Sequence, residues 1–374
     1  MSATGYLINQ RSAYQPVFTE DTTPVLNDFE SAYHYHQTLA DYKPTPLIEL
    51  PTLAKKCGIG KLLLKDEGQR FGTGALKILG ASYAVHHFTQ SEPVIGICTA
   101  TDGNHGRAVA WAAKHKGYKS VVFVPHFTKP GRIKAIEREG GKVIVSAGDY
   151  DTAVKEAAYF AREKNFKLIQ DTAWKEYLDV PATITSGYYT EMQELLNQTN
   201  RFSKPHIDVV FLQAGVGSWP SAVVHFFRKY LNNQSVKIVC VEPFESDCIY
   251  ESIKSKSLAT TRKSQKTIMA GLNCGTPSLL AFEILQQGAD AFMLISDHFT
   301  IDAIKYLNAP MPGDPYVASG ESGASGLGAL LALMQEKSLL DLKRFLQINE
   351  NSNILIFNTE NVTDAESISS VIQA

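Results

Sequence analysis

Apolar and polar positions follow two distinct rhythms over residues 94 to 170. Short apolar runs rich in β-branched residues predict strands at 94–98, 120–125, 142–146 and 167–170. The segments between them place apolar residues at three- and four-residue spacing, which predicts helices at 107–115, 132–138 and 150–164. Strands and helices that alternate in this way are typical of parallel sheets with helices on both faces. The fold class is therefore predicted as α/β.

A second series of strands is predicted in the later part of the chain. The runs 208–212, 236–241 and 353–357 are nearly continuous in apolar residues, as expected for strands covered on both sides. The two series together predict two open, mostly parallel sheets flanked by helices. The polar stretch from Ser252 to Lys266 is interpreted as a solvated loop, with a role in covering a site as the alternative.

The composition narrows the class of protein. The 374 residues are 44% hydrophobic and 20% charged, which suits a globular chain of two domains. A formal charge of -2 supplies no attraction to nucleic acid or to an anionic membrane. The five cysteines lack paired CxxC spacing, no apolar run approaches the roughly 18 residues that cross a bilayer, and the N-terminus lacks a secretory pattern. We expect a reducing, cytoplasmic location and no metal ion.

A lysine that follows a glycine-flanked turn is the first candidate for chemistry. Lys77 comes after Arg70-Phe-Gly-Thr-Gly-Ala-Leu76 and before Ile78-Leu-Gly-Ala-Ser-Tyr-Ala84, so its neighbours are mostly small or apolar. A lysine in a helix is usually a solvated charge. Desolvation among these neighbours would lower the pKa of the ammonium group and make the amine nucleophilic toward an aldehyde.

A short glycine loop, Ala214-Gly-Val-Gly-Ser218, joins the predicted strand at 208–212 to a predicted helix at 221–227. Its backbone amides can converge on a phosphate at the start of that helix. The loop lacks the GxGxxG pattern of dinucleotide sites and the Gly-Lys-Ser/Thr ending of a Walker loop. A phosphate monoester is the ligand that fits its size, and a plain connection is the alternative.

A polar turn, Thr101-Asp-Gly-Asn-His-Gly106, lies between another strand and helix. Asn104 can donate a side-chain hydrogen bond to a phenolate-like oxygen, although helix capping explains such residues equally well. His105 is a candidate general base, but the neighbouring carboxylate of Asp102 is the stronger one. Together with the lysine and the glycine loop, this turn completes the parts needed to hold pyridoxal phosphate.

These motifs resemble the fold-type II pyridoxal-phosphate enzymes, which include tryptophan synthase β, cysteine synthase and the serine/threonine dehydratases. The chain is most similar to the diaminopropionate ammonia-lyase family within that group. The motifs occur in the family's order and span most of the chain. They are Lys65-Asp-Glu67, Arg70-Phe-Gly72, Lys77 to Ala84, Thr101 to Arg107, Gln170-Asp-Thr-Ala-Trp174, Gln213 to Gly217, Val241-Glu-Pro243, Ile268 to Leu272 and Ser319-Gly-Glu-Ser-Gly-Ala324.

The resemblance implies a role for each of the catalytic residues. Lys77 would be the Schiff-base lysine and, once released, the proton donor to the leaving β-amine. Asp102 and Asp171 would act as bases on opposite faces of the substrate, one for each enantiomer of 2,3-diaminopropionate. Recognition of the β-ammonium group is the alternative role for Asp102. The products would be pyruvate and two molecules of ammonia.

The resemblance also implies the binding residues. Asn104 and Thr359 would contact the cofactor ring, with Thr359 at the pyridine nitrogen, and Thr101 and His105 would contact the substrate. The phosphate would be bound by Gly215, Val216, Gly217 and Ser218. The chain departs from the family where Asn358-Thr-Glu-Asn361 lacks an expected glycine. It departs again where Trp219-Pro220 adds bulk after the glycine loop.

A homodimer with a divided larger domain is also implied. The larger, cofactor-binding domain is expected at 1–88 and 201–374, with a smaller α/β domain inserted at 89–200. Two other functions remain open at this point. A serine or threonine dehydratase would use the same cofactor residues, and a non-catalytic protein would bind pyridoxal phosphate without turnover.

Overall fold

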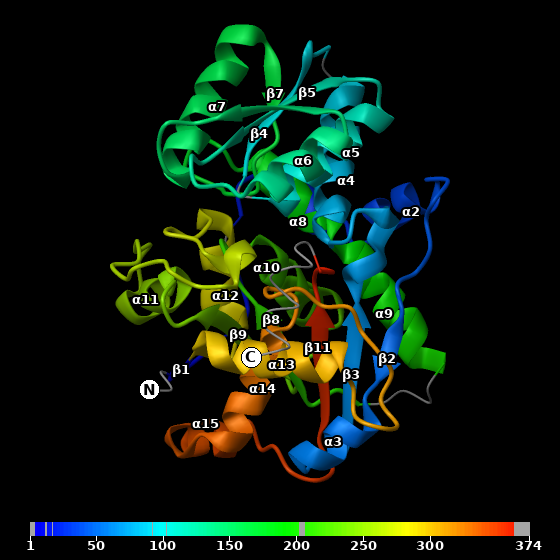
Figure 1. Ribbon diagram of the computed structural model, residues 1–374, viewed down its shortest axis with the longest axis vertical. Helices are drawn as coiled ribbons and strands as arrows, with labels where there is room; N and C mark the ends of the chain where they lie inside the picture. Colours follow the sequence, from blue (N-terminus) through cyan, green and yellow to red (C-terminus); the bar gives the residue numbers. More distant parts are fainter. Residues whose placement is uncertain are drawn as a thin grey trace. The chain divides into compact units, whose positions relative to one another are not determined.

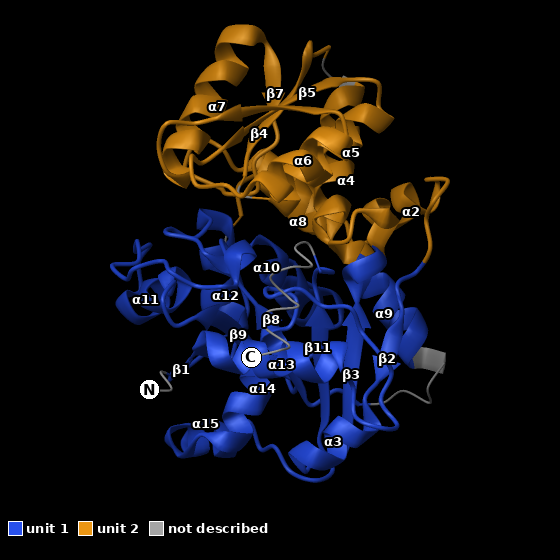
Figure 2. Cartoon of the chain, viewed as in Figure 1, with its two compact units in different colours: residues 1–17, 44–69, 191–374 blue, residues 18–43, 70–190 orange. Residues whose placement is uncertain are grey.

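The computed structural model describes residues 4–11, 13–16, 18–91, 93–101, 103–201 and 206–362. Internal contacts divide the chain into two compact units, coloured separately in Figure 2. The first unit comprises 1–17, 44–69 and 191–374, and the second comprises 18–43 and 70–190. Each unit has its own open sheet, so the predicted α/β class with two mostly parallel sheets is confirmed. No helix in the described part of the chain is long and apolar enough to span a membrane.

The sheet of the first unit has seven strands in the order β1-β10-β9-β8-β11-β3-β2. The two edge strands, β1 and β2, are antiparallel to their neighbours, and the inner strands are parallel. The bounds are β1 Gly5–Ile8, β2 Leu47–Glu49, β3 Lys61–Asp66, β8 Val209–Gln213, β9 Lys237–Pro243, β10 Ala291–Ile295 and β11 Asn353–Asn358. Antiparallel edges on a parallel sheet are common in α/β folds.

Helices cover this sheet because its inner strands are apolar on both faces (Figure 1). One face packs against α3, α13, α14 and α15 in a single large core. The remaining helices of the unit include the π-helical turn η2, which continues α10. The bounds are α3 Pro51–Cys57, α9 Tyr189–Arg201, α10 Ser218–His225, η2 Phe226–Tyr230, α11 Cys248–Ser255, η3 Ala270–Leu272, α12 Leu279–Gly288, α13 Asp297–Asn308, α14 Ser325–Gln335, η4 Lys337–Leu339 and α15 Leu340–Phe345.

The sheet of the second unit has four parallel strands in the order β6-β5-β4-β7. Helix α7 packs on one face, and α5 and α6 contribute to a smaller core on the other. The strands are β4 Gly96–Ala100, β5 Lys119–Val124, β6 Gly141–Val145 and β7 Phe166–Leu168. The helices are α1 Thr22–Leu26, α2 Ser31–Gln37, η1 Glu67–Gly72 at the unit boundary, α4 Lys77–Ser91, α5 Asn104–His115, α6 Pro130–Arg138, α7 Tyr150–Lys164 and α8 Asp179–Gly187.

Helix α4 belongs to the second unit, whereas the sequence led us to expect residues up to 88 in the larger domain. The reason is close packing between α4 and α8 through two glycines. A Cβ atom on Gly80 would lie 2.7 Å from Ile184 Cγ2, and one on Gly187 would lie 2.6 Å from the carbonyl oxygen of Leu79. Only residues without a side chain allow the two helix backbones to approach this closely. The segment 18–43 joins the same unit because α1 and α2 also pack against α8.

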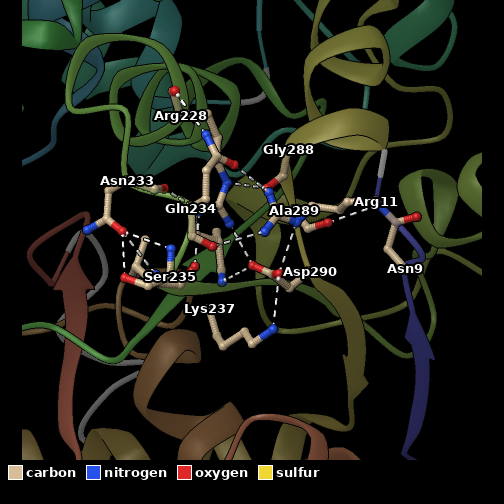
Figure 3. A network of polar contacts seen from close by, with 12 residues as sticks. Asn9, Arg11, Arg228, Asn233, Gln234, Ser235, Lys237, Gly288, Ala289 and Asp290 are labelled. Atoms are coloured by element: carbon tan, nitrogen blue, oxygen red, sulfur yellow. Dashed lines mark hydrogen bonds and ion pairs between the residues drawn. The ribbon is translucent and has the colours of Figure 1, made fainter. Parts of the chain in front are cut away.

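A buried ionic network in the first unit joins segments that are far apart in the sequence (Figure 3). The Asp290 carboxylate accepts hydrogen bonds from Arg228 Nη2 at 2.6 Å, from Arg11 Nε at 3.0 Å and from the backbone amide of Ile238 at 2.8 Å. Arg228 is fully buried in its side chain, and three backbone carbonyls accept its other N–H groups. The network therefore connects four segments, which are the residues after β1, strand β9, η2 and the start of β10.

The polar stretch from Ser252 to Lys266 was predicted as a solvated loop, but its first four residues belong to α11. The rest is mostly exposed and is also anchored. Lys263 Nζ lies 2.8 Å from Asp247 Oδ2 and donates to the carbonyl oxygen of Phe244. Thr261 is buried and donates to Asp247 Oδ1 at 2.6 Å. These contacts hold the loop against the turn between β9 and α11.

Candidate active site

The predicted site residues lie beyond the carboxyl ends of adjacent parallel strands, which is where α/β sheets bind ligands. In the second unit, β4 leads into Thr101 and its neighbour β7 leads into Asp171. In the first unit, β8 leads into the glycine loop and its neighbour β11 leads into Thr359. Parallel pairing thus brings together, within each unit, residues that are distant in the sequence.

Lys77 and Asp171 form an ion pair in the second unit. Lys77 is the first residue of α4, and its Nζ lies 2.8 Å from Asp171 Oδ2. The lysine side chain is 25% exposed and the aspartate side chain 7%. Burial by itself raises the pKa of the Asp171 carboxyl, but the charge of Lys77 and a smaller effect of His105 outweigh it and lower that pKa to about 2. Desolvation by the small, apolar neighbours of Lys77 is therefore opposed by this carboxylate, which stabilises the ammonium form.

His105 lies beside the same carboxylate. Its side chain is buried, its Nε2 is 2.8 Å from the carbonyl oxygen of Ile169, and its Nδ1 is 3.8 Å from Asp171 Oδ2. Burial lowers the pKa of the His105 imidazole, against a partial opposing effect from Asp171. The ring is therefore neutral at physiological pH.

The start of α5 and the residues before it depend on Thr101, Gly103 and Gly106. Thr101 is buried, and its Oγ1 accepts a hydrogen bond from the Gly103 amide at 2.9 Å. A Cβ atom on Gly106 would lie 2.3 Å from Thr101 Cγ2, so the Asn-His-Gly sequence needs its glycine. Asn104 is the first residue of α5. Asp102, the other predicted base, lies outside the described residues.

The glycine loop of the first unit starts α10. Gly217 is the residue before that helix, with a φ of 94° that a side chain would strain, and no side chain caps the helix. A Cβ atom on Gly215 would lie 3.0 Å from the carbonyl oxygen of Gly271. Val216 and Ser218 are both buried. The loop therefore presents backbone amides rather than side chains at a helix N-terminus, as an anion site requires.

Trp219 and Pro220, which departed from the family pattern, are accommodated in the core of the first unit. Trp219 is 4% exposed, packs edge-on against Phe357, and donates from Nε1 to Glu191 Oε2 at 2.7 Å. Pro220 lies in the first turn of α10, where a helix amide has no intrahelical partner to lose.

Thr359 is held by Gln213, a residue whose role the sequence did not indicate. Gln213 Nε2 lies 3.2 Å from Thr359 Oγ1 and also bonds the carbonyl oxygen of Phe357 at 2.9 Å. Glu360, next in the chain, accepts a hydrogen bond from the Ser322 amide at 2.9 Å. The signal that could have identified Gln213 is its place as a polar residue at the end of an apolar strand.

The residues present fit a phosphorylated aldehyde. A partly exposed primary amine suits the aldehyde, and an uncapped helix start with glycines suits the phosphate. A buried threonine hydroxyl suits a ring nitrogen. Among the described residues, no group of three His, Cys, Asp or Glu side chains could hold a metal ion.

Comparison with known proteins gives the same class. The family model of pyridoxal-phosphate dependent enzymes matches residues 39–344. A diaminopropionate ammonia-lyase of Escherichia coli (strain K12) is 35% identical over 375 residues, which cover 95% of this chain and 94% of that protein. One from Salmonella typhimurium (strain LT2) is 34% identical over 357 residues, covering 89% and 88%.

A solved structure agrees with these relatives. The crystal structure of the Escherichia coli enzyme in complex with an aminoacrylate-PLP azomethine reaction intermediate matches with a TM-score of 0.90 and 33% identity. The match covers 100% of this chain and 97% of that chain. The fold and site thus define a fold-type II pyridoxal-phosphate enzyme that acts as a carbon-nitrogen lyase. The chain belongs to the pyridoxal-phosphate dependent enzyme family, in the group that contains the diaminopropionate ammonia-lyases, and its cofactor is pyridoxal 5'-phosphate.

Proposed function

We propose that the protein catalyses α,β-elimination of 2,3-diaminopropionate, in both D and L forms, to pyruvate and two molecules of ammonia. The observation that carries this proposal is the carboxylate of Asp171, 2.8 Å from the amine of Lys77. A general base must lie next to the group that holds the substrate's reacting carbon. The similarity to diaminopropionate ammonia-lyases over nearly the whole chain supports the choice of substrate.

Each residue of the second unit has one proposed task. The bound cofactor supplies an electron-withdrawing ring that stabilises the charge left at the substrate's Cα. Lys77 holds the cofactor's aldehyde carbon, Asn104 orients the ring, and Thr101 and His105 contact the substrate. Asp171 removes the Cα proton of one enantiomer and Asp102 that of the other.

The leaving amine needs a proton because an amide anion is a very poor leaving group. Lys77 Nζ is the proposed donor, since it lies next to Asp171 and has protons to give once it is released. In the first unit, the amides of Gly215, Val216, Gly217 and Ser218 bind the phosphate. Thr359 bonds the ring nitrogen with a neutral hydroxyl, which Gln213 orients.

The two-base assignment predicts opposite enantiomer preferences in two variants. Asp171→Asn should lower turnover of one enantiomer by about 10²–10⁴ and spare the other, and Asp102→Asn should do the reverse. The measurement is pyruvate release from D- and L-2,3-diaminopropionate by the cofactor-loaded proteins. Equal losses of both activities in either variant would rule out separate bases.

The same assay separates the other functions. D- and L-serine should release far less pyruvate than the diamine, and L-threonine far less 2-oxobutyrate. A preference for serine or threonine would make the protein a dehydratase. Cofactor absorbance without product from any of these amino acids would indicate a non-catalytic binding protein.

Assembly as a homodimer in the cytoplasm is proposed as well, on the basis of the family resemblance. Sedimentation velocity of the cofactor-loaded protein should give a mass of about twice the 41.2 kDa chain. A monomer at micromolar concentration would contradict the assembly but not the chemistry.

A further inference from the structure

One ring nitrogen of His105, Nδ1, has no role in the reaction proposed above. The side chain is only 5% exposed. Its Nε2 lies 2.8 Å from the Ile169 carbonyl oxygen, which can only accept a hydrogen bond, so Nε2 carries the proton. In the described part of the chain Nδ1 has no hydrogen-bond partner, although it is buried. In the neutral ring Nδ1 is therefore an acceptor with an unused lone pair.

A charged group close to that lone pair is the Asp171 carboxylate. Nδ1 lies 3.8 Å from Oδ2, the same oxygen that Lys77 Nζ contacts at 2.8 Å. Among the described residues, the charged side chains that act on His105 include Asp171, from the segment after β7, and Lys77, from α4. Once the amine of Lys77 is occupied by the cofactor, His105 remains a titratable group beside Oδ2. Proton transfer needs a separation of ~3 Å, and hydrogen bonds of catalytic groups that are long without ligands tighten when the substrate is bound.

We propose that His105 accepts, at Nδ1, the proton that Asp171 removes from the substrate, so that Asp171 and His105 act as a relay. This inference rests on the proposed function. The Cα–H bond breaks and an O–H bond forms at Asp171, while the electron pair stays on the substrate. The O–H bond then breaks and an N–H bond forms at Nδ1, which restores the carboxylate. The imidazolium keeps its Nε2 bond to Ile169, and its extra proton leaves with the product ammonia as ammonium.

Two substitutions separate the relay from a purely structural role. His105→Gln places an amide N–H near the position of Nε2, so the bond to the Ile169 carbonyl is kept and the base is lost. His105→Asn places an amide near the position of Nδ1 and loses the bond to Ile169. If the role of His105 is structural, the asparagine variant should be the destabilised one. If the relay operates, the glutamine variant should fold but lose turnover of the enantiomer that depends on Asp171.

The first test needs no cofactor. In protein labelled with ¹⁵N-histidine, NMR should show His105 with the proton on Nε2. Lys77→Met should raise the pKa of His105, because a nearby positive charge is removed while Asp171 stays. A proton on Nδ1, or no change in the His105 pKa in Lys77→Met, would overturn the relay.

The second test uses the loaded enzyme. His105→Gln should bind the cofactor normally and lose about 10²–10⁴ in turnover of the same enantiomer that Asp171→Asn affects, with the other enantiomer within a few-fold of wild type. Unchanged rates for both enantiomers would contradict the relay. A wild type that releases no product would refute the proposed function, while the NMR experiment would still decide whether Nδ1 is the acceptor.

Discussion

The carboxyl group of Asp171 is charged in a place where burial alone opposes the charge. Lys77 Nζ at 2.8 Å offsets that cost, and the pKa of the carboxyl falls to about 2. His105 shows the opposite behaviour, because burial lowers its pKa and keeps the ring neutral. Both shifts mean that the unfolded chain binds more protons than the folded chain in acid, so stability falls as the pH falls.

Acid should therefore destabilise the cofactor-free protein in two ranges. The contribution of Asp171 is fully present above its unfolded pKa near 3.8 and is lost as the pH falls toward 2, by about 2 kcal/mol. The contribution of neutral His105 to the free energy of unfolding is fully present above pH 6.5 and is lost as the pH falls below that value. Urea unfolding followed from pH 8 to pH 2 measures both. His105→Gln should flatten the curve just below pH 6.5, and a curve with the wild-type slope there would contradict the neutral assignment.

At the scale of elements, the position of Lys77 depends on how α4 packs. The helix begins at Lys77 and meets α8 where Gly80 faces Gly187. A Cβ atom on Gly187 would lie 2.6 Å from a backbone oxygen and 2.7 Å from Gly80 Cα, and neither backbone atom can rotate away. The glycines therefore help to determine how far Lys77 lies from the strands that lead into Asp171 and Thr101.

Gly187→Ala should lower the free energy of unfolding by about 1–3 kcal/mol through overpacking. It should also weaken cofactor binding, because a displaced α4 carries Lys77 with it. Gly131→Ala is the matched control, since a Cβ atom there has open space around it in α6. That variant should be neutral or slightly stabilising. Thermal unfolding and cofactor titration measure both effects, and equal behaviour of the two variants would contradict the packing argument.

At the scale of the whole chain, contacts between distant segments stabilise each unit. In the first unit, Asp290 neutralises the buried Arg228 and also bonds Arg11, which follows the edge strand β1. A buried charge left without its partner costs far more than a solvated one. One carboxylate at the start of β10 thus joins the segment after β1, η2 and β9 (Figure 3).

Asp290→Ala should lower the free energy of unfolding by about 3–5 kcal/mol because Arg228 would remain buried and uncompensated. Asp341→Ala breaks an ion pair with Arg344 whose side chains are 72% and 78% exposed, and it should cost less than about 1 kcal/mol. Urea unfolding of both variants in the loaded protein gives the comparison. A small effect at Asp290 would show that water replaces the carboxylate.

The sequence alone determined the properties that depend on local spacing. Helix α7 was predicted at its observed bounds, and the predicted strands at 120–125 and 208–212 are each within a residue or so of β5 and β8. Local periodicity suffices because an apolar face repeats over a few residues wherever the segment lies in the fold. The cofactor was predicted from the Lys77 segment, the Thr101–Gly106 turn and the glycine loop, each of which is a short contiguous motif.

The tertiary structure decided which distant residues meet. Lys77 and Asp171 are 94 positions apart, and no local sequence pattern predicts that their side chains are in contact. The orientation of the His105 ring depends on a carbonyl 64 positions away, and the place of α4 depends on its glycine contact with α8. Pairings of this kind follow from strand order and helix packing, which bring far segments together only in the folded chain.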